Sequence, residues 1–100
     1  MRIYEQTVSS TGEADWIWVV NKGEAPQLYT IVVSMPEGSA MVDVEMTIDD
    51  DRIGPVPFTH DVLNSLTNTC GSMFQGPFTG IRLNIRDYKS GDITLKVMQS

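Results

Sequence analysis

The sequence is poor in the residues that build most catalytic and metal centres. Its 100 residues include one cysteine, Cys70, and one histidine, His60. A single cysteine excludes an intramolecular disulfide, so the chain needs no oxidising compartment in order to fold. One histidine and one cysteine also cannot supply the four ligands of a closed structural zinc site.

Long apolar segments and positive charge are scarce as well. The stretch MRIYEQTVSS lacks the apolar region of a signal peptide, and no run approaches the roughly 18 apolar residues of a membrane span. The chain has 7 basic and 13 acidic residues and a net charge of −6. The negative electrostatic potential of such a chain repels phosphate backbones and anionic lipids, so we expect no nucleic-acid partner and no membrane partner.

The residues that are abundant predict an all-β domain. Apolar residues make up 41% of the chain, and its length fits a single domain over residues 1–100. Short β-branched segments alternate with turns rich in Gly, Pro, Ser and Asn, and no helical period is present. We therefore predict an antiparallel β-sandwich or jelly roll of about six to eight strands. The expected strands cover 3–9, 15–20, 28–34, 41–49, 81–86 and 93–98, with a hairpin joining the last two, whereas 50–77 has no clear assignment.

Charged side chains alternate with apolar ones in two parts of the chain. The strand at 41–49 directs Val42, Val44, Met46 and Ile48 to the core and Asp43, Glu45, Thr47 and Asp49 outward. The final strands direct Arg82, Arg86 and Lys96 outward. If these strands are neighbours, the charges form cross-strand pairs. If they belong to opposite sheets, the molecule has one acidic and one basic face, which suits head-to-tail contacts.

Two tryptophans lie two positions apart in the segment DWIWVV. In a strand, Trp16 and Trp18 project from one face while Ile17 and Val19 project from the other. Because the whole segment after Asp15 is apolar, we favour a strand covered on both faces, with the tryptophans in the core. The other interpretation is an exposed aromatic pair, which can mark a protein interface or a platform for sugars.

His60, Asp61 and Cys70 have the residue types of a base, an orienting acid and a nucleophile. Nothing in their spacing selects that arrangement, because His-Asp pairs are common in loops and no nucleophile signature surrounds the cysteine. We expect a loop histidine that is hydrogen-bonded to its neighbours, and we expect no catalytic residue.

Three consecutive aspartates, Asp49, Asp50 and Asp51, offer oxygen ligands to a hard cation such as calcium. They do not follow the spacing of an EF-hand, and aspartates at the end of a strand more often form a solvated turn. We expect such a turn, with no metal and no cofactor.

The C-terminal segment carries a recognisable order of motifs. HDVLNSL is followed by TGIRLNI, a short glycine-containing turn and GDITLKVMQ. This order over residues 60–100 resembles small structural proteins of tailed bacteriophages, whose terminal hairpin is similar. The resemblance implies a non-enzymatic virion protein, a capsid decoration or cement protein that stabilises the head. It further implies synthesis in the host cytoplasm, a place on the capsid surface, and binding to the major capsid protein or other virion proteins as a homodimer or homotrimer.

On this hypothesis the apolar strand faces join subunits and the outward charges steer docking. The expected partner-binding residues are Trp16, Trp18, Asp43, Glu45, Asp49, Arg82, Arg86 and Lys96. The alternative function is a carbohydrate- or receptor-binding β-sandwich module, such as a tail or fibre accessory. That module would use the two tryptophans or the loop aromatics Phe58, Phe74 and Phe78.

Overall fold

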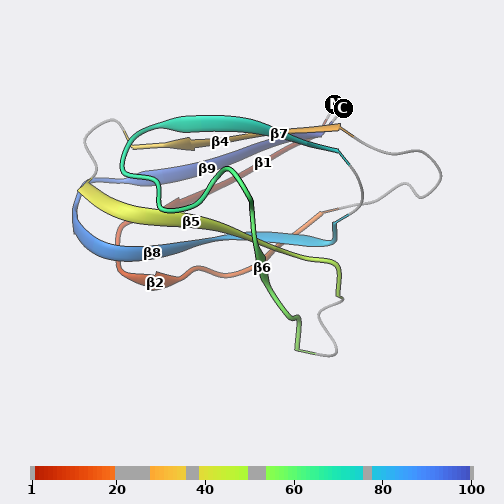
Figure 1. Ribbon diagram of the computed structural model, residues 1–100, viewed down its shortest axis with the longest axis horizontal. Coiled ribbons are helices and arrows are strands. Elements are labelled where there is room, and N and C mark those ends of the chain that lie inside the picture. The colour runs from red at the N-terminus through yellow and green to blue at the C-terminus, as the bar shows by residue number, and fades with distance from the viewer. Residues whose placement is uncertain (1, 20–27, 36–38, 50–53, 76–77, 100) are drawn as a thin grey trace.

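Two antiparallel β-sheets face each other across a shared hydrophobic core in the computed structural model of the chain (Figure 1). The structure describes residues 2–19, 28–35, 39–49, 54–75 and 78–99. One sheet has four strands and the other has five. The predicted all-β sandwich is therefore confirmed.

The four-stranded sheet has the strand order β1-β9-β4-β7. Its strands are β1 (Arg2–Val8), β9 (Ile93–Gln99), β4 (Leu28–Ser34) and β7 (Cys70–Gln75). The five-stranded sheet has the order β2-β8-β5-β6, and β3 pairs with the same edge of β8 as β2. Its strands are β2 (Gly12–Glu13), β3 (Ile17–Trp18), β5 (Ser39–Thr47), β6 (Phe58–Thr59) and β8 (Gly80–Ser90).

Strands with strong alternation lie where the sequence predicts them. β4 spans the predicted residues 28–34, and β1, β5, β8 and β9 overlap the other predicted strands closely. Among its described residues, 15–19, the predicted strand at 15–20 contributes the two residues of β3, at a sheet edge. The segment 50–77 contains β6, β7 and an isolated bridge between Val42 and Leu66.

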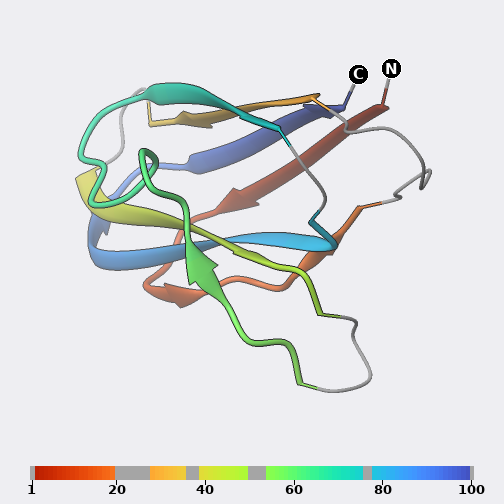
Figure 2. The same ribbon diagram turned by 45° about the vertical axis from the view of Figure 1, so that its right-hand side comes forward.

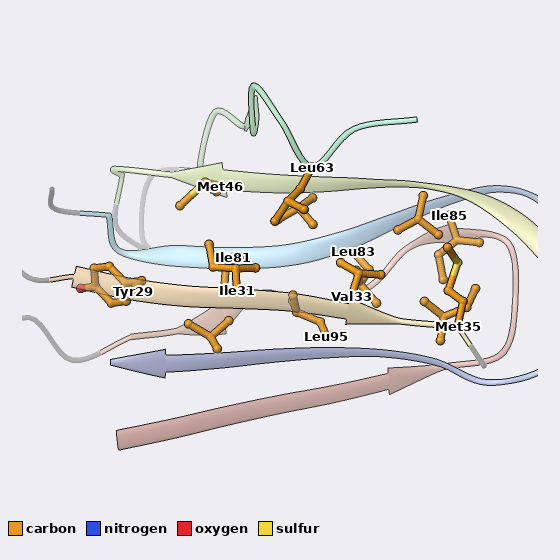
Figure 3. Packing of buried hydrophobic residues seen from close by; sticks show 14 of the residues in the cluster. Tyr29, Ile31, Val33, Met35, Met46, Leu63, Ile81, Leu83, Ile85 and Leu95 are labelled. Atoms are coloured by element: carbon orange, nitrogen blue, oxygen red, sulfur yellow. The ribbon is translucent and has the colours of Figure 1, made fainter. Parts of the chain in front are cut away.

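Alternate residues of the central strands fill the space between the sheets. Figure 3 shows Met46, Ile81 and Leu83 directed from the five-stranded sheet towards side chains of the four-stranded sheet. Leu63, from the segment after β6, packs beside them and is fully buried. The inward direction predicted for Ile48 is wrong, because β5 ends at Thr47 and the isoleucine side chain is 68% exposed.

The predicted terminal hairpin is wrong. β8 belongs to the five-stranded sheet and β9 to the four-stranded sheet, so the turn between them connects the two layers. Gly91 enables this turn with a φ of 85°, a left-handed conformation that favours glycine, and the Tyr88 hydroxyl donates a hydrogen bond to its carbonyl at 2.9 Å. Consequently, Arg82 and Arg86 lie on one outer face of the sandwich and Lys96 lies on the opposite one.

We predict that Leu83→Ala strongly destabilises the fold. Leu83 is fully buried in β8, and truncation of a buried leucine leaves a cavity that costs about 2–5 kcal/mol. Val62→Ala is the control, because that side chain is 54% exposed and surface changes of this kind stay within about 0.5 kcal/mol. Chemical denaturation followed by circular dichroism measures both values. Equal midpoints for the two variants would contradict the proposed core.

Candidate binding surface

The outer face of the five-stranded sheet carries paired charges from β5 and β8. Glu45 lies opposite Arg82 in the strand register, and Arg82 Nε donates to Glu45 Oε1 at 2.8 Å. One step along the sheet, Arg86 contacts the Asp43 carboxylate at 3.0 Å. The cross-strand pairing foreseen for neighbouring strands is therefore confirmed. The alternative of separate acidic and basic faces is wrong for these four residues.

Most of these charged side chains are less exposed than the alternation suggests. The side chains of Arg82 and Glu45 are each 13% exposed, and that of Asp43 is 15% exposed. Their pairing explains this, because adjacent strands hold the oppositely charged groups against each other and neighbouring segments cover them. Arg86 remains 46% exposed. The predicted steering role of an exposed Arg82 is thus not supported by its position.

A compact group of side chains, here called the tryptophan–arginine cluster, surrounds the Arg82 guanidinium. It consists of Trp16, Trp18, Glu13, Glu45 and Arg82. The guanidinium carbon lies 4.2 Å from the centre of the Trp16 ring, a cation–π contact, while the guanidinium also pairs with both Glu13 and Glu45. The two tryptophan rings have centroids 6.0 Å apart and are tilted by 34°. The local chain places this group at the sheet edge, because β2 and β3 flank Trp16 and both pair with β8.

Trp18 rests on the glycine opposite it in the sheet. Trp18 pairs with Gly80 in the strand register. A Cβ atom at position 80 would lie 3.0 Å from Cζ3 of Trp18 and 3.1 Å from Cγ2 of Thr47. The absence of a side chain at Gly80 therefore lets the indole lie close over β8, a known way for an aromatic side chain to compensate for a glycine in a strand.

The preferred placement of the tryptophans in the core is wrong. Trp18 is 37% exposed, Trp16 is half-buried, and neither belongs to the buried core. Val19 is buried and Ile17 packs against the core from the opposite face, as the alternation predicts. The segment forms a short edge strand with only one covered face, which its uniformly apolar sequence does not reveal.

The remaining charged residues of the expected binding set lie elsewhere. Lys96 is on the outer face of the four-stranded sheet, where it contacts Glu5 at 3.4 Å. Asp49 follows β5, and its carboxylate accepts a hydrogen bond from the backbone N–H of Val56 at 2.8 Å. Asp49 thus holds a turn, while Asp50 and Asp51 lie outside the described residues. The structure does not bring Asp49 or Lys96 into the tryptophan–arginine cluster.

His60 is buried, and its side chain accepts hydrogen bonds from the backbone of the residues that follow it. Its Nδ1 atom accepts hydrogen bonds from the N–H groups of Val62 and Leu63, both at 3.0 Å. An accepting Nδ1 carries no proton, so it cannot donate to Asp61 although the carboxylate lies 3.4 Å away. Burial lowers the pKa of His60, and the nearby Asp61 carboxylate opposes this change. The expectation of a locally bonded loop histidine is confirmed.

Cys70 starts β7 on the side that faces the core, and it is half-buried beside the core cluster. Within the described ranges, no three His, Cys, Asp or Glu side chains gather in a way that could hold a metal ion. The described part of the chain also contains no helix that is long and apolar enough to cross a membrane.

Comparisons with known proteins give no identification. No protein-family model, no curated protein and no solved structure matches the chain. The binding surface must therefore be interpreted from its own chemistry.

Sequence reasoning missed three members of this surface. Glu13 pairs with Arg82, Gly80 seats Trp18, and Asn84 donates a hydrogen bond to Glu45 Oε2 at 3.1 Å. A glycine that begins the alternating segment GIRLNI is a detectable signal, because glycine inside a strand often marks a close approach by another group. Glu13 lies in a predicted turn and had no such signal.

The cluster suits contact with a partner better than it suits catalysis. Its two carboxylates and one guanidinium leave a formal charge of −1 next to an exposed indole ring. The guanidinium of Arg82 is already paired with the carboxylates of Glu13 and Glu45 and stacked on a tryptophan ring, so it is not free to bind another anion. What the cluster offers a partner is the apolar face of Trp18 and the half-exposed carboxylate of Glu13, which accepts hydrogen bonds.

We predict that Gly80→Val destabilises the domain through Trp18. The added methyl groups meet the indole ring and Thr47, and overpacking of this kind costs about 1–3 kcal/mol. In a Trp18→Ala background the same change should cost less, because one of the two obstacles is gone. Denaturant unfolding of the four proteins gives the coupling energy. Equal costs in both backgrounds would show that Trp18 does not rest on Gly80.

We predict that His60 makes the domain sensitive to acid. The folded-state pKa of His60 lies below its ordinary value of 6.5, so the unfolded chain binds the proton more readily. The stability contributed by the neutral ring is present above pH 6.5 and declines as the pH falls from there towards the folded-state pKa. His60→Asn keeps an acceptor for the two N–H groups and removes the titration. The difference in unfolding free energy between the two proteins should therefore change below pH 6.5, and a difference that is independent of pH would refute the assignment.

Proposed function

We propose that the chain is a non-enzymatic structural protein of a tailed-phage virion that decorates the capsid and docks through the tryptophan–arginine cluster. The observation that supports this most is the exposed indole of Trp18 beside an arginine that is already held in place. Tryptophan and arginine dominate the energetic centres of protein interfaces. Side chains that are fixed before binding also lose less conformational entropy on docking.

The charges of the cluster favour a basic or neutral partner surface. The chain carries a net charge of −6, and the cluster itself is slightly acidic. A complementary patch on the major capsid protein would present lysine, arginine or N–H donors to Glu13 and an apolar pocket to Trp18. Many copies on one lattice, each joined to neighbouring subunits, would hold the protein by avidity even where a single contact is weak.

A carbohydrate- or receptor-binding module is the second candidate, and one observation favours it. Trp16 and Trp18 lie on one face with ring centroids 6.0 Å apart, and the exposed ring of such a pair can stack on a sugar. Phe58 is 40% exposed on β6, whereas Phe78 is fully buried and Phe74 packs against the core, so these last two are poor platform residues. The Arg82 guanidinium lies over the Trp16 ring, 4.2 Å from its centre, and so occupies a position that a sugar would need, which makes the protein-docking function the better supported one.

We predict that Trp18→Ala weakens attachment to the capsid. The experiment begins with mass spectrometry of purified particles, followed by removal of the protein, re-addition and counting of bound copies. Truncation of a central interface tryptophan costs about 2 kcal/mol or more, so we expect binding to weaken by a factor of about 30. Val62→Ala, across the sheet from the cluster, is the matched control and should bind as the unmodified chain does.

Two results would overturn the proposal. The first is that mass spectrometry finds no copy of the chain in purified virions. The second is that the re-added protein does not bind to stripped capsids. In either case, a Trp18-dependent change of tryptophan fluorescence on addition of a defined glycan would favour the carbohydrate-binding module instead.

A further inference from the structure

The outer face of the four-stranded sheet differs from that of the five-stranded sheet. A row of three apolar side chains and one threonine crosses it from one edge strand to the other, because the strand registers align Ile3 with Met98, Met98 with Thr30, and Thr30 with Met73. Ile3 and Met73 are each 57% exposed at the two ends of this row. Leu28, on β4 beside the row, is 40% exposed. Figures 1 and 2 show no described segment over this face.

The charge of this face is balanced although the chain is acidic. Its charged side chains are Glu5 and Lys96, which lie opposite each other on β1 and β9 and contact at 3.4 Å. The acidic excess of the chain, net −6, therefore lies elsewhere. Two copies of this protein repel each other overall, and they can meet with least repulsion where each presents a neutral apolar surface.

We infer that this face, here called the apolar face, is the interface of a two-fold homodimer. The outward residues of this face are Ile3, Glu5, Thr7, Leu28, Thr30, Val32, Ser34, Gly71, Met73, Gln75, Thr94, Lys96 and Met98, of which Glu5 and Lys96 are charged. A two-fold axis that runs along the strands between β9 and β4 reverses the strand order. It therefore sets Ile3 of one copy over Met73 of the other and Met98 over Thr30, as a self-complementary contact requires.

The same operation suits the charged pair at the middle of the face. Lys96 comes to lie over Val32 of the other copy, so its aliphatic stem packs on an apolar side chain while it keeps its contact with Glu5. Glu5 comes to lie over Gly71, which has no side chain to obstruct it. No unpaired charge is thereby buried in the dimer.

The size of the apolar face sets the strength of the contact. Four strands spaced about 4.8 Å apart, with seven residues at about 3.3 Å each, give a flat area of about 400 Å² before side-chain relief is counted. Specific interfaces begin at about 600 Å² of accessible surface per partner. The dimer must therefore use the whole face, and we expect a weak, concentration-dependent association.

Sedimentation and cross-linking test the dimer without any capsid, so their outcome is independent of the proposed function. The average mass measured by sedimentation should rise with concentration from that of the 11.1 kDa chain towards twice that value. The measurement should extend to about 1 mM, because at that concentration even an association of about 4 kcal/mol is half-formed. Met73→Glu, which adds a charge to the apolar face, should weaken this association at least tenfold. Val62→Glu, an exposed position outside that face, should not.

Cysteine pairs then report the symmetry in a Cys70→Ser background. A short bifunctional thiol reagent should cross-link a mixture of Ile3→Cys and Met73→Cys chains, because these positions face each other across sheets packed about 10 Å apart, while neither variant should cross-link with itself. In the two-fold dimer each of these positions lies about three strand spacings, about 14 Å, to the side of the same position in the other copy, which is too far for a disulfide, or for the short reagent, to join two chains of the same variant. A monomer at all concentrations, a trimer, an unchanged dimer in Met73→Glu, or cross-linking of a single variant with itself would each overturn the inference.

Discussion

Burial of alternate side chains from β4, β5, β8 and β9 is the constraint on which the rest of the structure depends. A slip of one residue in any of these strands would turn its apolar side chains to solvent, so their register is strongly specified. That register places Glu45 opposite Arg82 and Trp18 opposite Gly80. The geometry of the candidate binding surface is therefore a consequence of core packing on the reverse side of the same strands.

The sequence is sufficient to locate strands that have one covered face, because their period of two is visible in residues such as Val42, Val44 and Met46. It does not reveal the sheet to which a strand belongs. The short turn at Gly91 is compatible with a hairpin or with a connection between layers, and the choice depends on long-range pairing with β4 and β5. The same limit applies to β7, whose pairing with β4 involves residues far apart in the chain.

The candidate surface was only partly predictable for a related reason. Trp16, Trp18, Glu45 and Arg82 stand out by residue type and alternation, but their exposure depends on which neighbours cover them. An apolar run such as WIWVV has the same composition in a buried central strand and in a short edge strand. The position of β3 at the edge of β8 decides the matter, and that position follows from tertiary pairing.

The two outer faces of the sandwich can serve two contacts at once. They lie on opposite sides of the core, so a dimer formed through the apolar face leaves the tryptophan–arginine cluster of each copy directed outward. A two-fold dimer then presents two clusters to its surroundings. Because the two-fold axis lies between the two four-stranded sheets, the two clusters point in opposite directions, and a single capsid surface can engage only one of them. The dimer therefore adds no second contact with the same capsid surface, and attachment to the lattice depends on the affinity of the one cluster that faces it, while the other cluster stays directed away from the capsid.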